Sequence, residues 1–340
     1  MIGLPEIVAG TILAALAFYV LMAGADFGGG VWDLFATGPR AERQRHVIAH
    51  AIGPVWEANH VWMIVAIVLL FTGFPSAFAA IMTGLHIPIT VMLVGIVLRG
   101  SSFVFRKVEA VDEGERSPWQ LVFAISSLIT PVMIGVVIGT LSTPALEWRD
   151  GIIQGGFLRP WLQPFPWAIG GFTLALYAWL AATYLTLESD DEALQGDFRA
   201  RALASGAAVA VLGGISGALW YTSAVESTQA FLTSGLGLTI FGAGAFSWVG
   251  CMLALWSWRL ILARAAAVVT ALSIMAGWGL AQFPWLVPGS LTLRDAAAPD
   301  VTLRLVLWVL GGGSVLLVPA FVYLYVTFKR GVLFPRGESS

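Results

Sequence analysis

Long apolar stretches separated by short polar segments dominate the chain. About 20 mostly apolar residues are needed for a helix to cross about 30 Å of hydrocarbon, and stretches of that kind predict about nine spans here. They lie near 5–35, 53–73, 77–99, 119–141, 164–187, 203–224, 236–258, 262–283 and 304–328. Because only residues 73–76 separate the second from the third, we expect a tight antiparallel hairpin there. The seventh and eighth are divided only by residues 256–259, so eight spans are the alternative if one of them is re-entrant or peripheral.

Composition supports this prediction. Hydrophobic residues make up 58% and charged residues 11% of the 340, and the mean hydropathy is +0.84. Since an ordinary soluble domain carries about 25% charge, a water-facing globule is excluded. The net charge of −2 gives no sign of a nucleic-acid partner, and a single cysteine excludes disulfides within the chain and Cys-ligated clusters. We therefore expect an all-α integral membrane protein with one transmembrane domain, residues 1–340, whose first apolar run is a span and not a signal peptide.

Basic residues predict the orientation. The odd-numbered loops and the C-terminal tail hold 14 of the 18 Lys and Arg residues. Cytoplasmic loops carry the excess of these residues, so the N-terminus is expected outside and the C-terminus in the cytoplasm. The alternation also favours an odd number of spans. The longest polar stretch, residues 188–201, is expected to be a solvated cytoplasmic loop.

Ionisable residues within predicted spans mark candidate functional positions, because they are costly to bury in a bilayer. Asp26 lies in the first span and Glu57 in the second, with His60 three residues further along the same helix face. Arg99 ends the third span. The predicted topology brings these groups to a similar depth near the cytoplasmic side. A proton relay and a structural clamp of paired charges both fit such a cluster, and the sequence leaves the two open.

Metal and cofactor sites have less support. The Glu57-x-x-His60 spacing occurs once, whereas a di-metal carboxylate site needs two such motifs and further Glu residues. The four histidines show no pairing suited to axial haem ligation, so we expect neither a metal nor a haem bound by this chain alone. Trp56 and Trp62 flank the Glu57–His60 pair, where they either wall a quinone or lipid pocket or pack between helices.

Four blocks of sequence, in order along the chain, carry a resemblance to a known family. They are Gly24-Ala25-Asp26-Phe27-Gly28, residues 52–62 around Pro54-Val55-Trp56-Glu57, residues 98–106 beginning Leu98-Arg99-Gly100, and residues 283–296 with Ser290-Leu291-Thr292-Leu293-Arg294-Asp295. With these blocks the chain resembles subunit II of the cytochrome bd quinol oxidases, nearly end to end. The block around Arg99 looks more like the cyanide-insensitive branch.

The resemblance implies two four-helix bundles plus one extra helix, in the bacterial inner membrane. It implies that the haems and the main quinol site belong to a partner, subunit I, and that this chain is the non-haem subunit. Stabilisation of subunit I, a proton path from the cytoplasm, a structural quinone, a small accessory subunit and contacts with membrane lipid are further implications. Asp26, Glu57 and Arg99 match the family's intramembrane positions, whereas no role transfers to His60.

Two departures and one alternative remain at this point. The family usually has Asp-Gly where this chain has Glu57-Ala58, and an aromatic residue where it has Ala25 before Asp26. The alternative is a secondary transporter that uses Asp26, Glu57 and His60 as coupling groups. It predicts inverted repeats and broken helices near the midplane, and only residues 28–30 suggest such a break.

Overall fold

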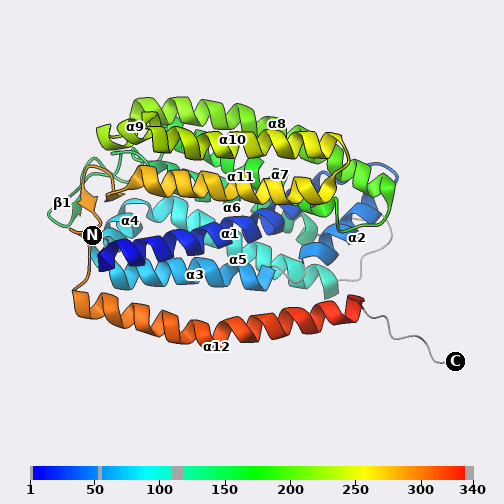
Figure 1. The fold of residues 1–340 in the computed structure, drawn as a ribbon, viewed down its shortest axis with the longest axis horizontal. Helices are drawn as coiled ribbons and strands as arrows, with labels where there is room; N and C mark the ends of the chain where they lie inside the picture. Colours follow the sequence, from blue (N-terminus) through cyan, green and yellow to red (C-terminus); the bar gives the residue numbers. More distant parts are fainter. Residues whose placement is uncertain (1–2, 53–55, 109–117, 334–340) are drawn as a thin grey trace.

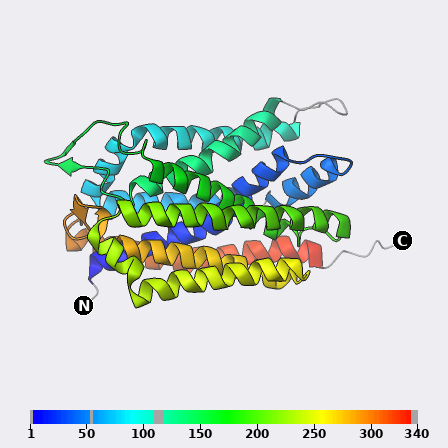
Figure 2. The same ribbon diagram turned by 90° about the horizontal axis from the view of Figure 1, so that it is seen from above.

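The computed structural model describes residues 3–52, 56–108 and 118–333, and it is almost entirely helical. The helices run roughly along one long axis, with small loops and hairpins gathered at the ends (Figures 1 and 2). Helix bounds are α1 (Leu4–Leu34), α2 (Ala41–Ile52), α3 (Trp56–Gly73), α4 (Pro75–Gly84), α5 (His86–Val108), α6 (Pro118–Thr140), α7 (Pro164–Leu185), α8 (Glu192–Ser223), α9 (Glu226–Thr233), α10 (Gly235–Trp256), α11 (Leu260–Gln282) and α12 (Asp300–Leu333).

Two short antiparallel hairpins complete the fold. They pair β1 (Trp148–Arg149) with β2 (Ile152–Ile153), and β3 (Trp285–Val287) with β4 (Leu291–Thr292). Both lie at the end of the bundle where α1 begins, whereas α12 ends at the opposite end (Figure 1).

Seven described helices are long and apolar enough to span a membrane: α1, α5, α6, α7, α8, α10 and α11. Among them α10 and α11 are two separate helices, each long and apolar enough to span, where the sequence prediction placed its seventh and eighth spans. The bent pair α3 and α4 brings the number to eight if it counts as one span. Helix α12, predicted as a span over 304–328, is not among these helices in the described part of the chain.

The segment after α3 differs from the prediction. In place of an antiparallel hairpin, α4 begins at Pro75 and bends 117° from α3. It ends at Gly84, and the long helix is α5, so the prediction of one span over 77–99 was wrong. Both pieces are apolar, which hides the break from a hydropathy count. Pro88 then lies in the first turn of α5, where its missing N–H costs no helical hydrogen bond.

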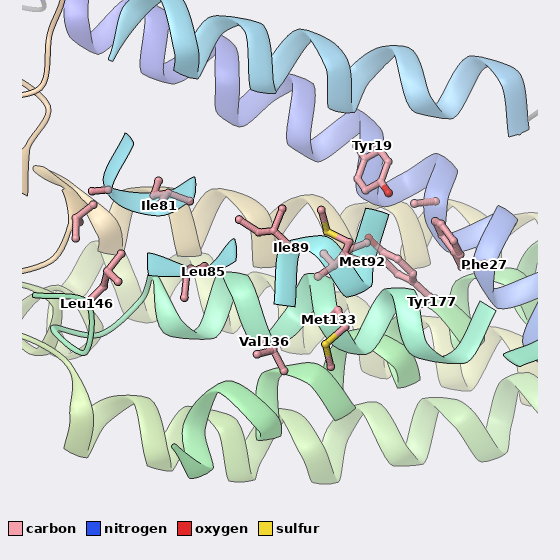
Figure 3. Close-up of a cluster of buried hydrophobic side chains, with 14 residues drawn as sticks. Tyr19, Phe27, Ile81, Leu85, Ile89, Met92, Met133, Val136, Leu146 and Tyr177 are labelled. Carbon is pink, nitrogen blue, oxygen red and sulfur yellow. The ribbon is translucent and has the colours of Figure 1, made fainter. Parts of the chain in front are cut away.

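Helix α1 packs against α3, α6, α7 and α11, and so lies at the centre of the bundle. Glycines allow this close approach: a Cβ at Gly28 would lie 2.0 Å from the carbonyl oxygen of Tyr177, and one at Gly30 would lie 2.1 Å from Ser127 Oγ. Small residues at helix contacts have this effect in membrane bundles. The main apolar core fills the space between α1, α5, α6 and α7 (Figure 3).

Candidate functional site: a buried polar cluster

Asp26 is the centre of the site. It lies in the glycine-rich second half of α1, and no part of its side chain is exposed. A carboxylate buried at such a place must be paired or hydrogen-bonded to persist as a charge. The surrounding helices supply these partners.

Arg99 of α5 is the counter-ion. Its guanidinium, also fully buried, forms an ion pair through Nη2 with Asp26 Oδ1, and the same nitrogen donates a hydrogen bond of 2.9 Å to the backbone oxygen of Asp26. The guanidinium carbon lies 5.0 Å from the ring centre of Phe27 and 4.9 Å from that of Phe123. Such cation–π contacts stabilise a cation that has left water.

The position of Arg99 corrects one detail of the prediction. The sequence argument placed it at the end of a span and counted it with the loop residues, but α5 continues to Val108 and Arg99 is an internal residue of that helix. Because Arg99 is buried within a helix, it does not support the orientation that was predicted from basic residues in loops. Its meeting with Asp26 nevertheless follows the predicted similarity in depth.

Asn59 of α3 is a member of the cluster that sequence reasoning missed. It is fully buried, and its Nδ2 donates a hydrogen bond of 3.3 Å to Asp26 Oδ2. The cluster therefore joins three helices, α1, α3 and α5, around one carboxylate. The neighbouring His60 is partly buried and close enough to interact electrostatically with both Asp26 and Arg99. A search for ionisable residues does not detect Asn59, because its amide is uncharged. A search for any polar residue inside an apolar span would have found it.

The remaining predicted residues divide into two groups. The side chains of Trp56 and Glu57 lie outside the described part of the structure. Trp62 stacks on Phe18 of α1, with ring centres 4.6 Å apart, so its indole contributes to the packing of α1 against α3. Within the described residues, no three His, Cys, Asp or Glu side chains come together as a metal site.

A second polar cluster, just beyond the C-terminal end of α1, was also missed. The stretch predicted as a solvated loop, residues 188–201, contains the start of α8 from Glu192 onward. Asp191 caps that helix by accepting from the N–H groups of Ala193 and Leu194. These bonds, with the nearby Arg43 guanidinium, hold the pKa of the Asp191 carboxyl below its usual range. The loop prediction was wrong because capping residues are polar yet belong to the helix end.

Helix α2 is fastened to α8 by this second cluster. Arg40 Nη2 lies 2.6 Å from Asp197 Oδ1, and Gln44 Nε2 donates a 2.7 Å hydrogen bond to Asp197 Oδ2. Hydrogen bonding to Asp197 and its charge raise the pKa of the Arg40 guanidinium. Arg201 of α8 in turn donates to Gln44 Oε1 at 2.7 Å. The contacts fix the segment after α1 against the start of α8, where the sequence suggested only a loop.

Comparison with known proteins assigns a family to this fold and its polar cluster. The family model described as cytochrome bd terminal oxidase subunit II matches residues 4–328. The chain belongs to that family. As a subunit II it is part of an oxidoreductase complex and a multi-pass inner-membrane protein, which decides against the transporter alternative.

Individual relatives agree with the subunit II assignment. Cytochrome bd-I ubiquinol oxidase subunit 2 of Escherichia coli strain K12 is 26% identical over 94% of this chain and 91% of its own length. A putative cytochrome bd menaquinol oxidase subunit II of Bacillus subtilis is 23% identical over 94% of both chains. In fold, the chain is similar to a chain of the bd oxidase from Geobacillus thermodenitrificans, with a TM-score of 0.75, 18% identity and coverage of 96% of this chain and 98% of that one.

Proposed function

We propose that this chain is the non-haem subunit of a quinol:oxygen oxidoreductase, and that it stabilises the haem-bearing subunit I and contributes a proton path from the cytoplasm. Electron transfer to oxygen takes place in subunit I, so the chain alone is not catalytic. The observation that carries the proposal is the fully buried Asp26, tied to Arg99 and Asn59 from two other helices. Titratable groups within a membrane are by default functional.

The contacts support different roles for the acid and the base. Arg99 keeps its charge at every physiological pH and is held by a carbonyl oxygen and two rings, so it serves as a fixed clamp. Asp26 and His60 are groups that change protonation state, and they lie close to each other. Relay and clamp are then two properties of one cluster. Glu57, in the same helix as His60, is the further acid of the proposed path.

The finer topology is part of the proposal. It has nine spans, the N-terminus outside and the C-terminus in the cytoplasm, arranged as two four-helix bundles plus one extra helix. Nine helices of 18 or more residues are described, from α1 to α12, which supports this number. The start of α1 and the end of α12 at opposite ends of the bundle are also consistent with an odd number of crossings (Figure 1).

Quinone and lipid contacts are the least supported part. The pocket proposed at Trp56 and Trp62 would hold a structural quinone or a lipid tail, and the stacking of Trp62 on Phe18 favours a packing role for that residue. Quinol as substrate belongs to the proposal because the named relatives are ubiquinol and menaquinol oxidase subunits. A small accessory subunit is proposed from the resemblance alone.

Substitution of the acids in the purified complex tests the proposal. Asp26→Asn and Glu57→Gln remove one charge each at similar volume, and we expect lower oxygen reduction or an altered haem spectrum in subunit I. The matched control is Asp190→Asn, which changes an exposed carboxylate just before α8. Wild-type turnover together with wild-type haem spectra in both acid variants would refute both the proposed proton path and the proposed stabilisation of the haem-bearing subunit.

A further inference from the structure

Three buried polar atoms near Asp26 or its neighbour Phe27 have no hydrogen-bond partner among the described residues. They are the hydroxyl oxygens of Tyr19 and Tyr177 and the Oδ1 atom of Asn59. All three side chains are essentially inaccessible from outside the molecule. They come from three different helices, α1, α7 and α3, so a single local distortion does not account for them.

The three groups surround one region. Tyr19 lies seven residues before Asp26, which is two helical turns or about 10 Å along the same face of α1. The Tyr177 ring stacks on that of Phe27, the residue after Asp26, at 6.4 Å between centres. Tyr19 is close enough to interact electrostatically with Tyr177, Asp26 and Arg99. Figure 3 shows Tyr19, Phe27, Met92 and Tyr177 in the same part of the core.

An unsatisfied buried polar atom keeps the cost of leaving water without a compensating hydrogen bond, so three of them together destabilise one core substantially. Internal water removes this cost when it meets two to four polar partners. The donors and acceptors here are suited to water: each tyrosine hydroxyl donates and accepts, Asn59 Oδ1 accepts, and Asn59 Nδ2 is already committed to Asp26. Apolar ligands would leave all three atoms unpaired.

We propose that Tyr19, Tyr177 and Asn59 bind a small internal cluster of water that continues the Asp26 site toward the N-terminal half of α1. This inference rests on the proposed function and deepens it, because the water and the two hydroxyls extend the proton path beyond Asp26. Each water or hydroxyl oxygen takes a proton on a lone pair and releases another to the next oxygen. After one proton has passed, each hydroxyl and water has reversed its hydrogen-bond direction and turns back before the next transfer; no bond other than O–H changes, and no redox partner is needed.

Tyr19→Phe and Tyr177→Phe, singly and together, test the water cluster. Each change removes one hydroxyl and keeps the ring that packs in the core. In the purified complex we expect the double variant to lose several-fold in turnover at saturating quinol and to show a larger H2O/D2O rate ratio, with an unchanged haem spectrum. Tyr184→Phe is the matched control, since it lies on the same helix as Tyr177 but beside Arg264.

A direct measurement accompanies the kinetics. Density from a high-resolution map of the wild-type complex is expected to show ordered water within hydrogen-bond distance of Asn59 Oδ1 and of at least one of the two hydroxyls. If that region is dry in a map that resolves other buried water, the proposal is overturned. Ordered water combined with wild-type turnover and isotope ratio in the double variant would overturn the proton route.

The outcome is separable from that of the proposed function. If Asp26→Asn is impaired while the tyrosine double variant is fully active, only the proposed extension of the proton path through the water cluster is refuted. If Asp26→Asn is fully active, the proposed proton path through Asp26 is itself refuted. If the double variant fails to assemble with subunit I, the two single variants decide by the same readouts.

Discussion

The Asp26–Arg99 pair lends itself to a double-mutant cycle. Arg99→Met removes the charge and keeps a long apolar side chain between the two rings, whereas Asp26→Asn keeps the shape and the contact with Asn59. The double variant carries neither charge. All three are compared with the wild-type chain in its complex with subunit I.

The magnitudes follow from what each change leaves behind. Arg99→Met leaves a fully buried carboxylate that keeps, among the described residues, the 3.3 Å hydrogen bond from Asn59. Breaking a buried pair in this way costs about 3–5 kcal/mol. Asp26→Asn leaves a guanidinium that still contacts the backbone carbonyl of residue 26 and two aromatic rings. Each ring stabilises a desolvated cation by up to about 2 kcal/mol. We therefore expect Asp26→Asn to destabilise the chain by an amount at the lower end of the range given for Arg99→Met. Replacing both charges removes the uncompensated ion, so the double variant is expected within about 2 kcal/mol of wild type.

Pulse proteolysis of the purified complex in mixed micelles, with the band of this subunit followed against denaturant, gives its free energy of unfolding. The expected coupling energy is about 3 kcal/mol or more, because neighbours in one network are strongly non-additive. Two single variants within about 1 kcal/mol of wild type would refute a buried charge pair. A double variant as unstable as the sum of the singles would show that the two residues act independently.

Other predictions concern helix contacts and the second polar cluster. Gly28→Ala is expected to abolish assembly, because its Cβ would lie 2.0 Å from a backbone carbonyl oxygen of α7. The control Gly10→Ala, whose Cβ would have nothing within 4 Å, is expected to assemble normally. The yield of haem-containing complex distinguishes the two variants. Asp197→Ala frees Arg40, so α2 should be cleaved faster in limited proteolysis, with Asp190→Ala unchanged. Asp191 has a lowered pKa, so its stabilising contribution is complete above about pH 4 and is lost as the pH falls through that pKa; an acid melt of Asp191→Ala should lack this loss.

The apolar pattern was sufficient for most of the architecture. Spans predicted near 119–141, 164–187 and 262–283 agree closely with α6, α7 and α11, because each is bounded by proline, glycine or polar residues that end an apolar run. The assignment failed between α3 and α5, where an apolar sequence contains a sharp bend. Hydropathy measures the tendency to leave water and says little about the direction of the chain.

The polar clusters were also predicted only in part from the sequence. Counting ionisable residues found Asp26 and Arg99, because a charge in a span is rare enough to be a signal. It missed Asn59, whose amide is neutral, and it missed the α2–α8 contacts, whose residues look like those of any loop. Their roles depend on partners distant in sequence, such as Arg40 and Asp197, which no local pattern links.

The permanent charge of Arg99 has an electrical consequence. With Asp26 ionised the pair is neutral, and with Asp26 protonated the same site carries one positive charge. Since the pair lies inside membrane-spanning helices, loading a proton onto it moves charge through part of the transmembrane voltage. That voltage amounts to about 2.3 kcal/mol per elementary charge for each 100 mV. If Asp26 takes up protons as we propose, an energised membrane shifts the proton occupancy of the pair without any change in its contacts.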